Sequence, residues 1–267
     1  MGYGLGDATR RRAERALTRR DRGEHPESDW LELGPVGHNG DTMQVESRDS
    51  VSLKPAELDE LGQLLAAVGL SGMDTQLEGH VEHFPLIVFA AIDEDTHGFL
   101  FGSLERVGGT PCILWGLGAA KKGRQAGLAV KGMVGELYRR AAISFPDEDV
   151  LVAGRIAHPA AYGLLQGLAD VVPRPGYAPT GEERAWGRRL ARRFGCDTRY
   201  DDRAFRVTPK GKGKASPEAV LDASTVKGGG KAATEVLGEV DPMRGEAVIA
   251  FGWATADALA NGLGHTS

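Results

Sequence analysis

The chain has 267 residues, a net charge of −5 and two cysteines. That length allows one large domain, or one domain with appendages. The acidic balance argues against a dedicated nucleic-acid-binding protein, although local basic patches are compatible with it. Cys112 and Cys196 lie far apart and form no CxxC pair, so we expect neither a disulfide framework nor a metal site. This cysteine usage fits a reducing, cytoplasmic compartment, and no apolar leader or run of membrane-spanning length argues otherwise.

The first segment, residues 1–41, is expected to be a basic arm and linker outside the folded domain. Residues 8–22 are rich in arginine, and residues 34–41 are rich in glycine. The arginines would be costly to bury without partners, which favours an arm over a core element. The folded domain is therefore predicted to begin with the strand-like residues 42–47.

A helix is predicted to follow at Pro55, because proline suits the first turn of a helix. Apolar residues then recur at helical spacing and form one stripe. Gly69 is expected to end the helix, and residues 71–83 are expected to form a second, short one. The stripe consists of Leu58, Leu61, Leu64, Leu65 and Val68.

Three apolar runs of strand length come next, at residues 86–92, 99–107 and 111–117. Two turn-like segments, residues 93–98 and 108–110, separate them. Short connections between successive strands favour an antiparallel meander.

A glycine-bearing basic segment, residues 121–129, joins the last of these strands to a periodic segment at residues 130–143. The order predicts strand, turn and helix. The start of a helix exposes backbone N–H groups and the positive end of the helix dipole, and both favour a bound phosphate. Glycine lets such a ligand approach the backbone closely. Lys121 and Lys122 are additional candidates for phosphate contacts, although a solvated loop is the favoured interpretation.

Residues 149–153 then predict a further strand, and residues 158–165 a short helix. Together with Arg124-x-x-Gly127-x-Ala129, this order resembles that of the GCN5-related N-acetyltransferase (GNAT) family, whose phosphate turn reads (Gln/Arg)-x-x-Gly-x-(Gly/Ala). The resemblance covers residues 45–207. It implies a mixed α/β fold with a largely antiparallel, twisted sheet flanked by helices, in which the fourth and fifth strands part.

The resemblance also implies acyl transfer, most simply of an acetyl group, from acetyl-CoA or another acyl-CoA to the amine of a small molecule or protein. The backbone of the turn would hold the pyrophosphate, and the backbone N–H groups of the fourth strand would polarise the acyl carbonyl. For His158, a contact with the pantetheine arm and a helix cap are both open. The implied coenzyme-binding residues are Leu117, Ala119, Arg124, Gln125, Ala126, Gly127, Leu128, Ala129 and His158.

Two residues are candidates for acid–base catalysis. Many GNAT proteins place a tyrosine near the end of the short helix as a general acid, but Leu165 stands at that position here, and Tyr162 lies one turn earlier. Tyr162 is therefore a candidate acid, and a core or surface tyrosine is the favoured alternative. Glu105 is a candidate base, and an ordinary surface carboxylate is the alternative.

Residues 182–194 predict a basic helix, and residues 204–208 a closing strand. This divides the chain into the arm, a GNAT-like domain at 42–209, and a Lys/Gly-rich linker with a C-terminal extension at 210–267. The basic helix and arm are candidates for contact with an acidic macromolecule, such as tRNA or an acyl carrier protein, and a solvated helix face is the more common explanation of such a pattern. Two alternatives to acyl-CoA transfer thus stay open: a donor carried by such a macromolecule, or a non-catalytic GNAT-like binding or assembly protein.

Overall fold

A computed structural model of the chain describes most of the residues after the expected arm. The described ranges are 43–70, 77–93, 95–165, 167–209, 221–222, 230–241 and 244–260. The arm, residues 1–41, lies outside them. No helix within these ranges is long and apolar enough to cross a membrane.

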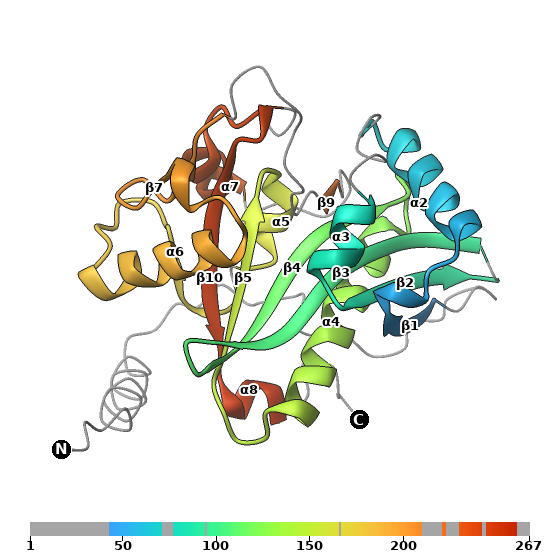
Figure 1. Cartoon of the computed structure of the whole chain (residues 1–267), viewed down its shortest axis with the longest axis horizontal. Helices are drawn as coiled ribbons and strands as arrows, with labels where there is room; N and C mark the ends of the chain where they lie inside the picture. Colours follow the sequence, from blue (N-terminus) through green and yellow to red (C-terminus); the bar gives the residue numbers. More distant parts are fainter. Residues whose placement is uncertain are drawn as a thin grey trace. The chain divides into compact units, whose positions relative to one another are not determined.

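Ten strands and several helices make up these ranges (Figure 1). The strands are β1 (Gln44–Asp49), β2 (Leu86–Ile92), β3 (Asp95–Val107), β4 (Thr110–Ala120), β5 (Val150–Ile156), β6 (Ala169–Val172), β7 (Tyr200–Asp201), β8 (Arg206–Val207), β9 (Leu221–Asp222) and β10 (Ala247–Ala254). The α-helices are α2 (Pro55–Ala67), α3 (Leu77–His83), α4 (Ala126–Ser144), α5 (Pro159–Gly163), α6 (Gly181–Arg193), α7 (Gly230–Leu237) and α8 (Ala256–Ala260). Short 3-10 turns occur at Ser50–Ser52 and Asp197–Arg199.

All the strands belong to one sheet, in the order β1-β2-β3-β4-β5-β10-β8-β7. Off this path, β6 pairs with β10 and β9 pairs with β4. The strands from β1 to β4 are antiparallel neighbours, as the short connections predicted. The pair β4 and β5 is parallel, with α4 as the crossover between them. The sheet is therefore mixed and mostly antiparallel, as expected.

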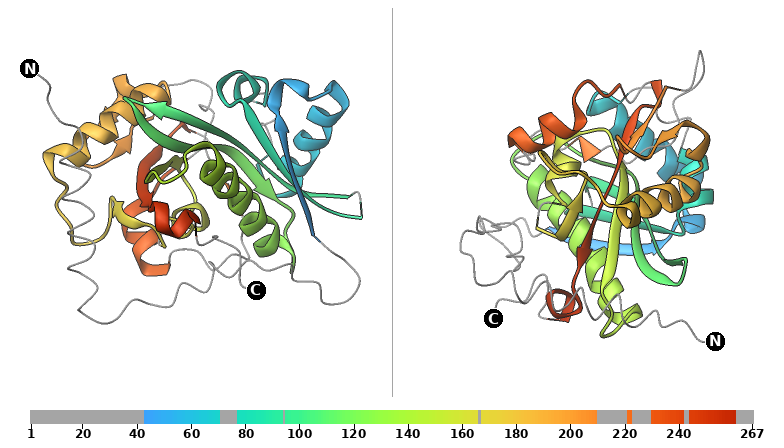
Figure 2. Two further views of the ribbon diagram at one scale, coloured as in Figure 1. Left: turned by 90° about the horizontal axis from the view of Figure 1, so that it is seen from below. Right: turned by 90° about the vertical axis from the view of Figure 1, so that its left-hand side faces the viewer.

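Helices cover both faces of the sheet beside β4. A Cβ atom added at Gly102 would lie 3.0 Å from Leu137 on α4. One added at Gly116 would lie 2.8 Å from the ring of Phe84, the residue after α3. Figure 2 shows α4 on one face of β1–β4 and α2 with α3 on the other. Thus α4 and the end of α3 pack directly on β3 and β4, from opposite faces of the sheet.

The periodic patterns correctly identify the faces that the helices bury. Five residues of α4 were expected on one face, and each is at most 3% exposed: Val130, Met133, Val134, Leu137 and Ala141. Of the stripe predicted for α2, four of the five residues are buried, including Val68 directly after the helix, and only Leu58 is partly exposed. Burial of a leucine-sized side chain contributes about 1.5–3 kcal/mol, so these stripes hold both helices against the sheet.

Two parts of the sheet differ from the expectation. First, β3 begins at Asp95, so it includes most of the expected turn 93–98. A salt bridge from Asp95 to Lys121, beyond the end of β4, holds this early part of the strand. Second, the expected closing strand is only the two residues of β8.

The main strand beside β5 is β10, from the segment expected to be a C-terminal extension. It pairs with β5 on one side and with β8 and β6 on the other. Seven of its eight residues are buried. The sheet therefore extends past residue 209, and a division of the chain there would separate β10 from the strands that it pairs with.

Candidate active site

The glycine-bearing turn lies between β4 and α4, as the sequence predicted, but it is shorter than expected. It spans residues 121–125, because α4 begins at Ala126, four residues before the expected start at 130. Gly123 has a φ of +147°, a conformation that suits a glycine. The Ala126 N–H donates to the Gly123 carbonyl at 3.2 Å, and the first α-helical bond runs from Ala129 N–H to Gln125 O at 2.9 Å. Because Gly127 and Leu128 precede a full turn of helix, their N–H groups have no carbonyl of α4 to donate to.

The side chains of this turn differ in their contacts within the protein and in their exposure. Lys121 Nζ lies 2.6 and 2.8 Å from the carboxylate oxygens of Asp95. This contact holds the pKa of Asp95 below its usual value. Arg124 is exposed beside the helix start, and Gly127 is half-buried. Lys121 thus has a partner within the fold, and Arg124 is the better placed cation for a phosphate.

Strands β4 and β5 pair over a short stretch and then part. Residues 112–115 of β4 align with 151–154 of β5. Further along β4, Gly118 and Ala119 pair with β9 instead. The expected parting of the fourth and fifth strands is therefore confirmed, and a segment of the same chain pairs with the β4 edge beyond it.

A β-bulge shapes β4 at the same level. Leu100 of β3 lies opposite Gly118, and Gly102 lies opposite Trp115, so two residues of β4 face one residue of β3. The bulge includes Leu117, whose N–H donates to Nδ1 of His80 at 3.4 Å. We expected this N–H group to polarise an acyl carbonyl. The structure instead gives it an acceptor within the protein.

His158 caps a helix, one of its two expected roles. It precedes α5, and its Nδ1 accepts a hydrogen bond from the Ala160 N–H at 3.3 Å. Pro159 occupies the first helical position, as is favourable there. A contact between His158 and a pantetheine arm stays a prediction.

Tyr162 is buried in α5, and its hydroxyl donates to the carbonyl oxygen of Pro173 at 2.8 Å. Burial raises the pKa of this hydroxyl, so the phenol keeps its proton. Leu165, at the position where relatives carry the tyrosine, is fully buried. This geometry gives Tyr162 a partner within the protein, and its role as a general acid remains an untested prediction.

Glu105 lies on β3 in a two-point ion pair with Arg193 of α6. The Nε to Oε1 distance is 2.5 Å, and the Nη2 to Oε2 distance is 3.1 Å. Arg193 also donates to the carbonyl oxygen of His83 at 2.9 Å. A carboxylate held in this way stabilises the packing of α6 on the sheet, and would have to leave Arg193 to accept a proton.

The basic helix α6 has partners for several of its arginines. Besides Arg193 with Glu105, Arg188 forms a salt bridge with Asp202, and the Arg189 guanidinium lies 4.9 Å from the ring of Trp186. These contacts favour a structural role for this helix over a surface for an acidic macromolecule.

One residue near the bulge was not identified from the sequence. His80 carried no recognisable motif, because it is a single histidine in a short helix. Only the three-dimensional contact with Leu117 makes it a candidate. Within the described ranges, no cluster of three or more His, Cys, Asp or Glu side chains could hold a metal ion.

Comparisons with known proteins give only partial structural matches of low sequence identity. No family model and no curated protein sequence matches the chain. Among solved structures, an acyl-CoA N-acyltransferase from Pseudomonas aeruginosa shares 19% identity, covers 52% of this chain and 88% of that one, and has a TM-score of 0.36. A GNAT family acetyltransferase from Brucella melitensis in complex with acetyl-CoA shares 16% identity, covers 45% of this chain and 82% of that one, and has a TM-score of 0.30. Naa50 from Arabidopsis thaliana, in complex with a bisubstrate analogue, shares 10% identity, covers 49% of this chain and 86% of that one, and has a TM-score of 0.30.

The order and direction of the strands characterise the fold. An antiparallel meander leads into β4, a helix start follows β4 directly, and β5 returns parallel to β4 before the two strands part. By the order and direction of these strands, the described part of the chain has the GNAT-like fold that the sequence predicted.

Proposed function

We propose that the protein is an acyl-CoA-dependent N-acyltransferase that transfers an acyl group, most simply acetyl, to an amine. The observation that carries the proposal is the start of α4. Its first N–H groups, which have no carbonyl of α4 to donate to, lie one short turn after β4, the strand that parts from β5. Solved structures of similar fold were determined with acetyl-CoA or a CoA-containing bisubstrate analogue.

The residues of the turn fit a pyrophosphate. The N–H groups of Gly127 and Leu128 provide donors at the positive end of a 19-residue helix. Gly127 has no side chain to fill the space in front of them, and the exposed Arg124 is available as a counter-charge. The amide groups of a pantetheine arm could pair with the β4 edge as β9 does now.

The reaction requires few protein groups. The amine nitrogen attacks the thioester carbon, and the electron pair of the carbonyl moves to oxygen. When that pair returns, the C–S bond breaks and the thiolate leaves, while the proton lost by the nitrogen passes to the thiolate or to water. Alignment of the two reactants supplies much of the rate, so engaged side chains at Tyr162 and Glu105 are compatible with turnover.

The test is calorimetry of CoA and acetyl-CoA with the wild type and with Gly127→Glu. The new carboxylate would occupy the phosphate position and repel it, so we expect at least about a hundredfold weaker binding. Gly181→Glu is the matched control, because it makes the same change at the first residue of α6, where an added Cβ meets no atom within 4 Å. Equal affinities in the wild type and Gly127→Glu would refute the phosphate site.

A non-catalytic GNAT-like binding protein is the second candidate. It is favoured by the pairing of β9 with β4, and by the partners of Tyr162 and Glu105 within the fold. Release of CoA thiol in the presence of a panel of small amines and peptide N-termini separates the two. Binding of acetyl-CoA without release for any amine would favour this second function.

A further inference from the structure

His80 is a buried polar side chain at the bulge of β4. Its exposed fraction is 0%. The imidazole stacks on two rings, those of Phe84 and Phe101, each with a centroid distance of 5.6 Å. Gly116 makes room for this stack, since a Cβ there would lie within 3.0 Å of both phenylalanines. The ring is therefore held firmly against β4.

The hydrogen bond from Leu117 determines which imidazole nitrogen carries the proton. Leu117 N–H is a donor, so Nδ1 of His80 must be the unprotonated, accepting nitrogen. Burial, with the nearby positive charge of Arg155, lowers the pKa of His80 to about 3. The ring is therefore neutral at physiological pH, and its single proton is on Nε2.

This Nε2–H group has no hydrogen-bond partner among the described residues. Buried donors are nearly always paired, because an unmade hydrogen bond costs free energy in the interior. The group lies on the ring that contacts Leu117, next to the stretch of β4 that has parted from β5. A ligand atom that accepts a hydrogen bond at this point would satisfy the Nε2–H donor.

We infer that His80 donates the hydrogen bond from Nε2–H to the carbonyl oxygen of the acyl thioester. The inference rests on the proposed acyl-CoA function. In this arrangement the His80 side chain polarises the acyl carbonyl, the role that was expected of the Leu117 N–H group. The Leu117 N–H group instead donates to Nδ1 of His80 and so fixes the imidazole tautomer. As the amine attacks and negative charge develops on the oxygen, the hydrogen bond strengthens.

The neutral state of the ring suits this role. A neutral imidazole donates a hydrogen bond without transferring its proton, so it stabilises an oxyanion and does not compete as a general acid. The same Arg155 that disfavours a charged His80 also favours negative charge on a nearby oxygen. A neutral donor and a nearby positive charge would both favour a ligand oxygen that gains electron density.

The test compares acetyl-CoA with S-ethyl-CoA, a thioether that lacks the carbonyl oxygen, on the full-length chain. In the wild type we expect about tenfold tighter binding of acetyl-CoA, the size of one hydrogen bond. In His80→Phe, which keeps an aromatic ring between Phe84 and Phe101, the preference should vanish, and kcat should fall about 10²–10³-fold. His83→Phe, an exposed histidine of the same helix, is the matched control and should keep the preference.

A measurement on the wild type covers the possibility that His80→Phe fails to fold. Nitrogen-15 NMR should show the Nε2–H tautomer in the free protein, and acetyl-CoA but not S-ethyl-CoA should shift the Nε2 proton downfield. A proton on Nδ1, or equal wild-type affinity for the two ligands, would overturn the role of His80 alone. Binding of neither ligand would also refute the proposed function.

Discussion

Replacement of Tyr162 by phenylalanine separates a structural from a catalytic role of this residue. The change removes one hydrogen bond, 2.8 Å long, from a buried hydroxyl to the carbonyl oxygen of Pro173, and leaves the packing of the ring intact. Pro173 is partly exposed, so water can replace the lost donor. We therefore expect a loss of about 1 kcal/mol in the free energy of unfolding, near the mean for one hydrogen bond. In a domain of this size that lowers Tm by roughly 2–4 °C.

The effect on turnover should be small, less than about tenfold, whereas a well-placed general acid contributes about 10²–10⁴-fold. Differential scanning calorimetry measures the first effect, and release of CoA thiol the second. Tyr138→Phe is the control, because that hydroxyl is equally buried and has no hydrogen-bond partner among the described residues, so its removal should not destabilise the fold. A hundredfold drop in kcat for Tyr162→Phe, with unchanged affinity for CoA, would show that Tyr162 is the acid and that our structural interpretation is wrong.

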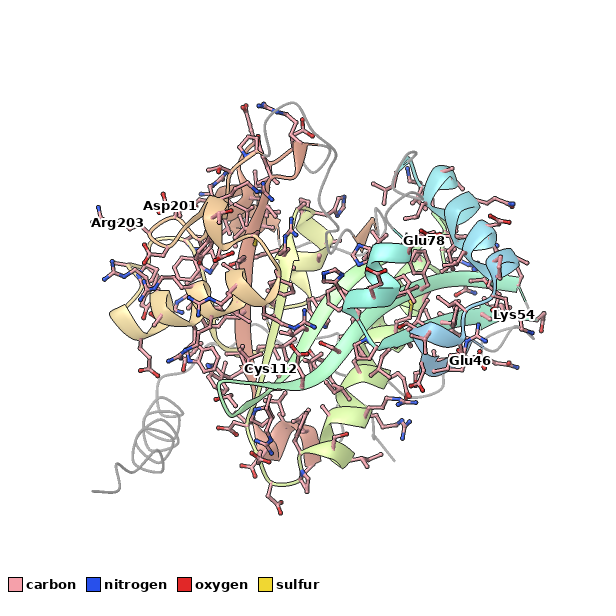
Figure 3. All side chains as sticks on the ribbon, in the orientation of Figure 1. Glu46, Lys54, Glu78, Cys112, Asp201 and Arg203 are labelled. Carbon is pink, nitrogen blue, oxygen red and sulfur yellow. The ribbon has the colours of Figure 1, made fainter. Side chains whose placement is uncertain are left out.

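Three further outcomes are expected. Deletion of residues 210–267 should abolish cooperative thermal unfolding, because it removes β10 from between β5 and β8; a cooperative melt at unchanged Tm would contradict this. Burial raises the pKa of Tyr138 and Tyr200. Above about pH 10 the folded state therefore binds more protons than the unfolded state, so the free energy of unfolding should fall as pH rises. Urea titrations at several pH values should show this fall, and it should be less steep in Tyr138→Phe. Burial also raises the pKa of Cys112, which is labelled in Figure 3, to about 12. Neither Cys112 nor the buried Cys196 should therefore react with Ellman's reagent at pH 8 until guanidinium is added; rapid labelling of the native protein would refute their burial.

The sequence predicted the elements that have one dominant local signal. The strand at Leu86–Ile92 has the predicted bounds, because a continuous apolar run ends at turn residues on both sides. The helix predicted at 130–143 is present as α4, Ala126–Ser144, because its apolar spacing is a strong local signal; its start lies four residues earlier than predicted. This signal, with the glycine-bearing turn before it, located the candidate phosphate site beside β4.

The sequence did not predict features that depend on distant contacts. β10 is apolar and short, and it follows Lys/Gly-rich segments, so nothing local indicates that it pairs with β5. The partners of Tyr162 and Glu105 lie 11 and 88 residues away in the sequence, and neither pairing has a sequence signature. His80 became a candidate only through its contact with Leu117, 37 residues away.

The pairing of β9 with Gly118 and Ala119 means that the chain itself competes for this edge of β4. An extended ligand can pair there only in molecules whose β9 has left the strand. Its apparent dissociation constant is then the intrinsic one divided by the fraction of such molecules, so an edge open in about one molecule in ten weakens binding about tenfold. Substitutions at residues 221–222 that weaken the pairing would tighten ligand binding without adding any contact. Affinity at this edge would then be set partly by residues that never touch the ligand.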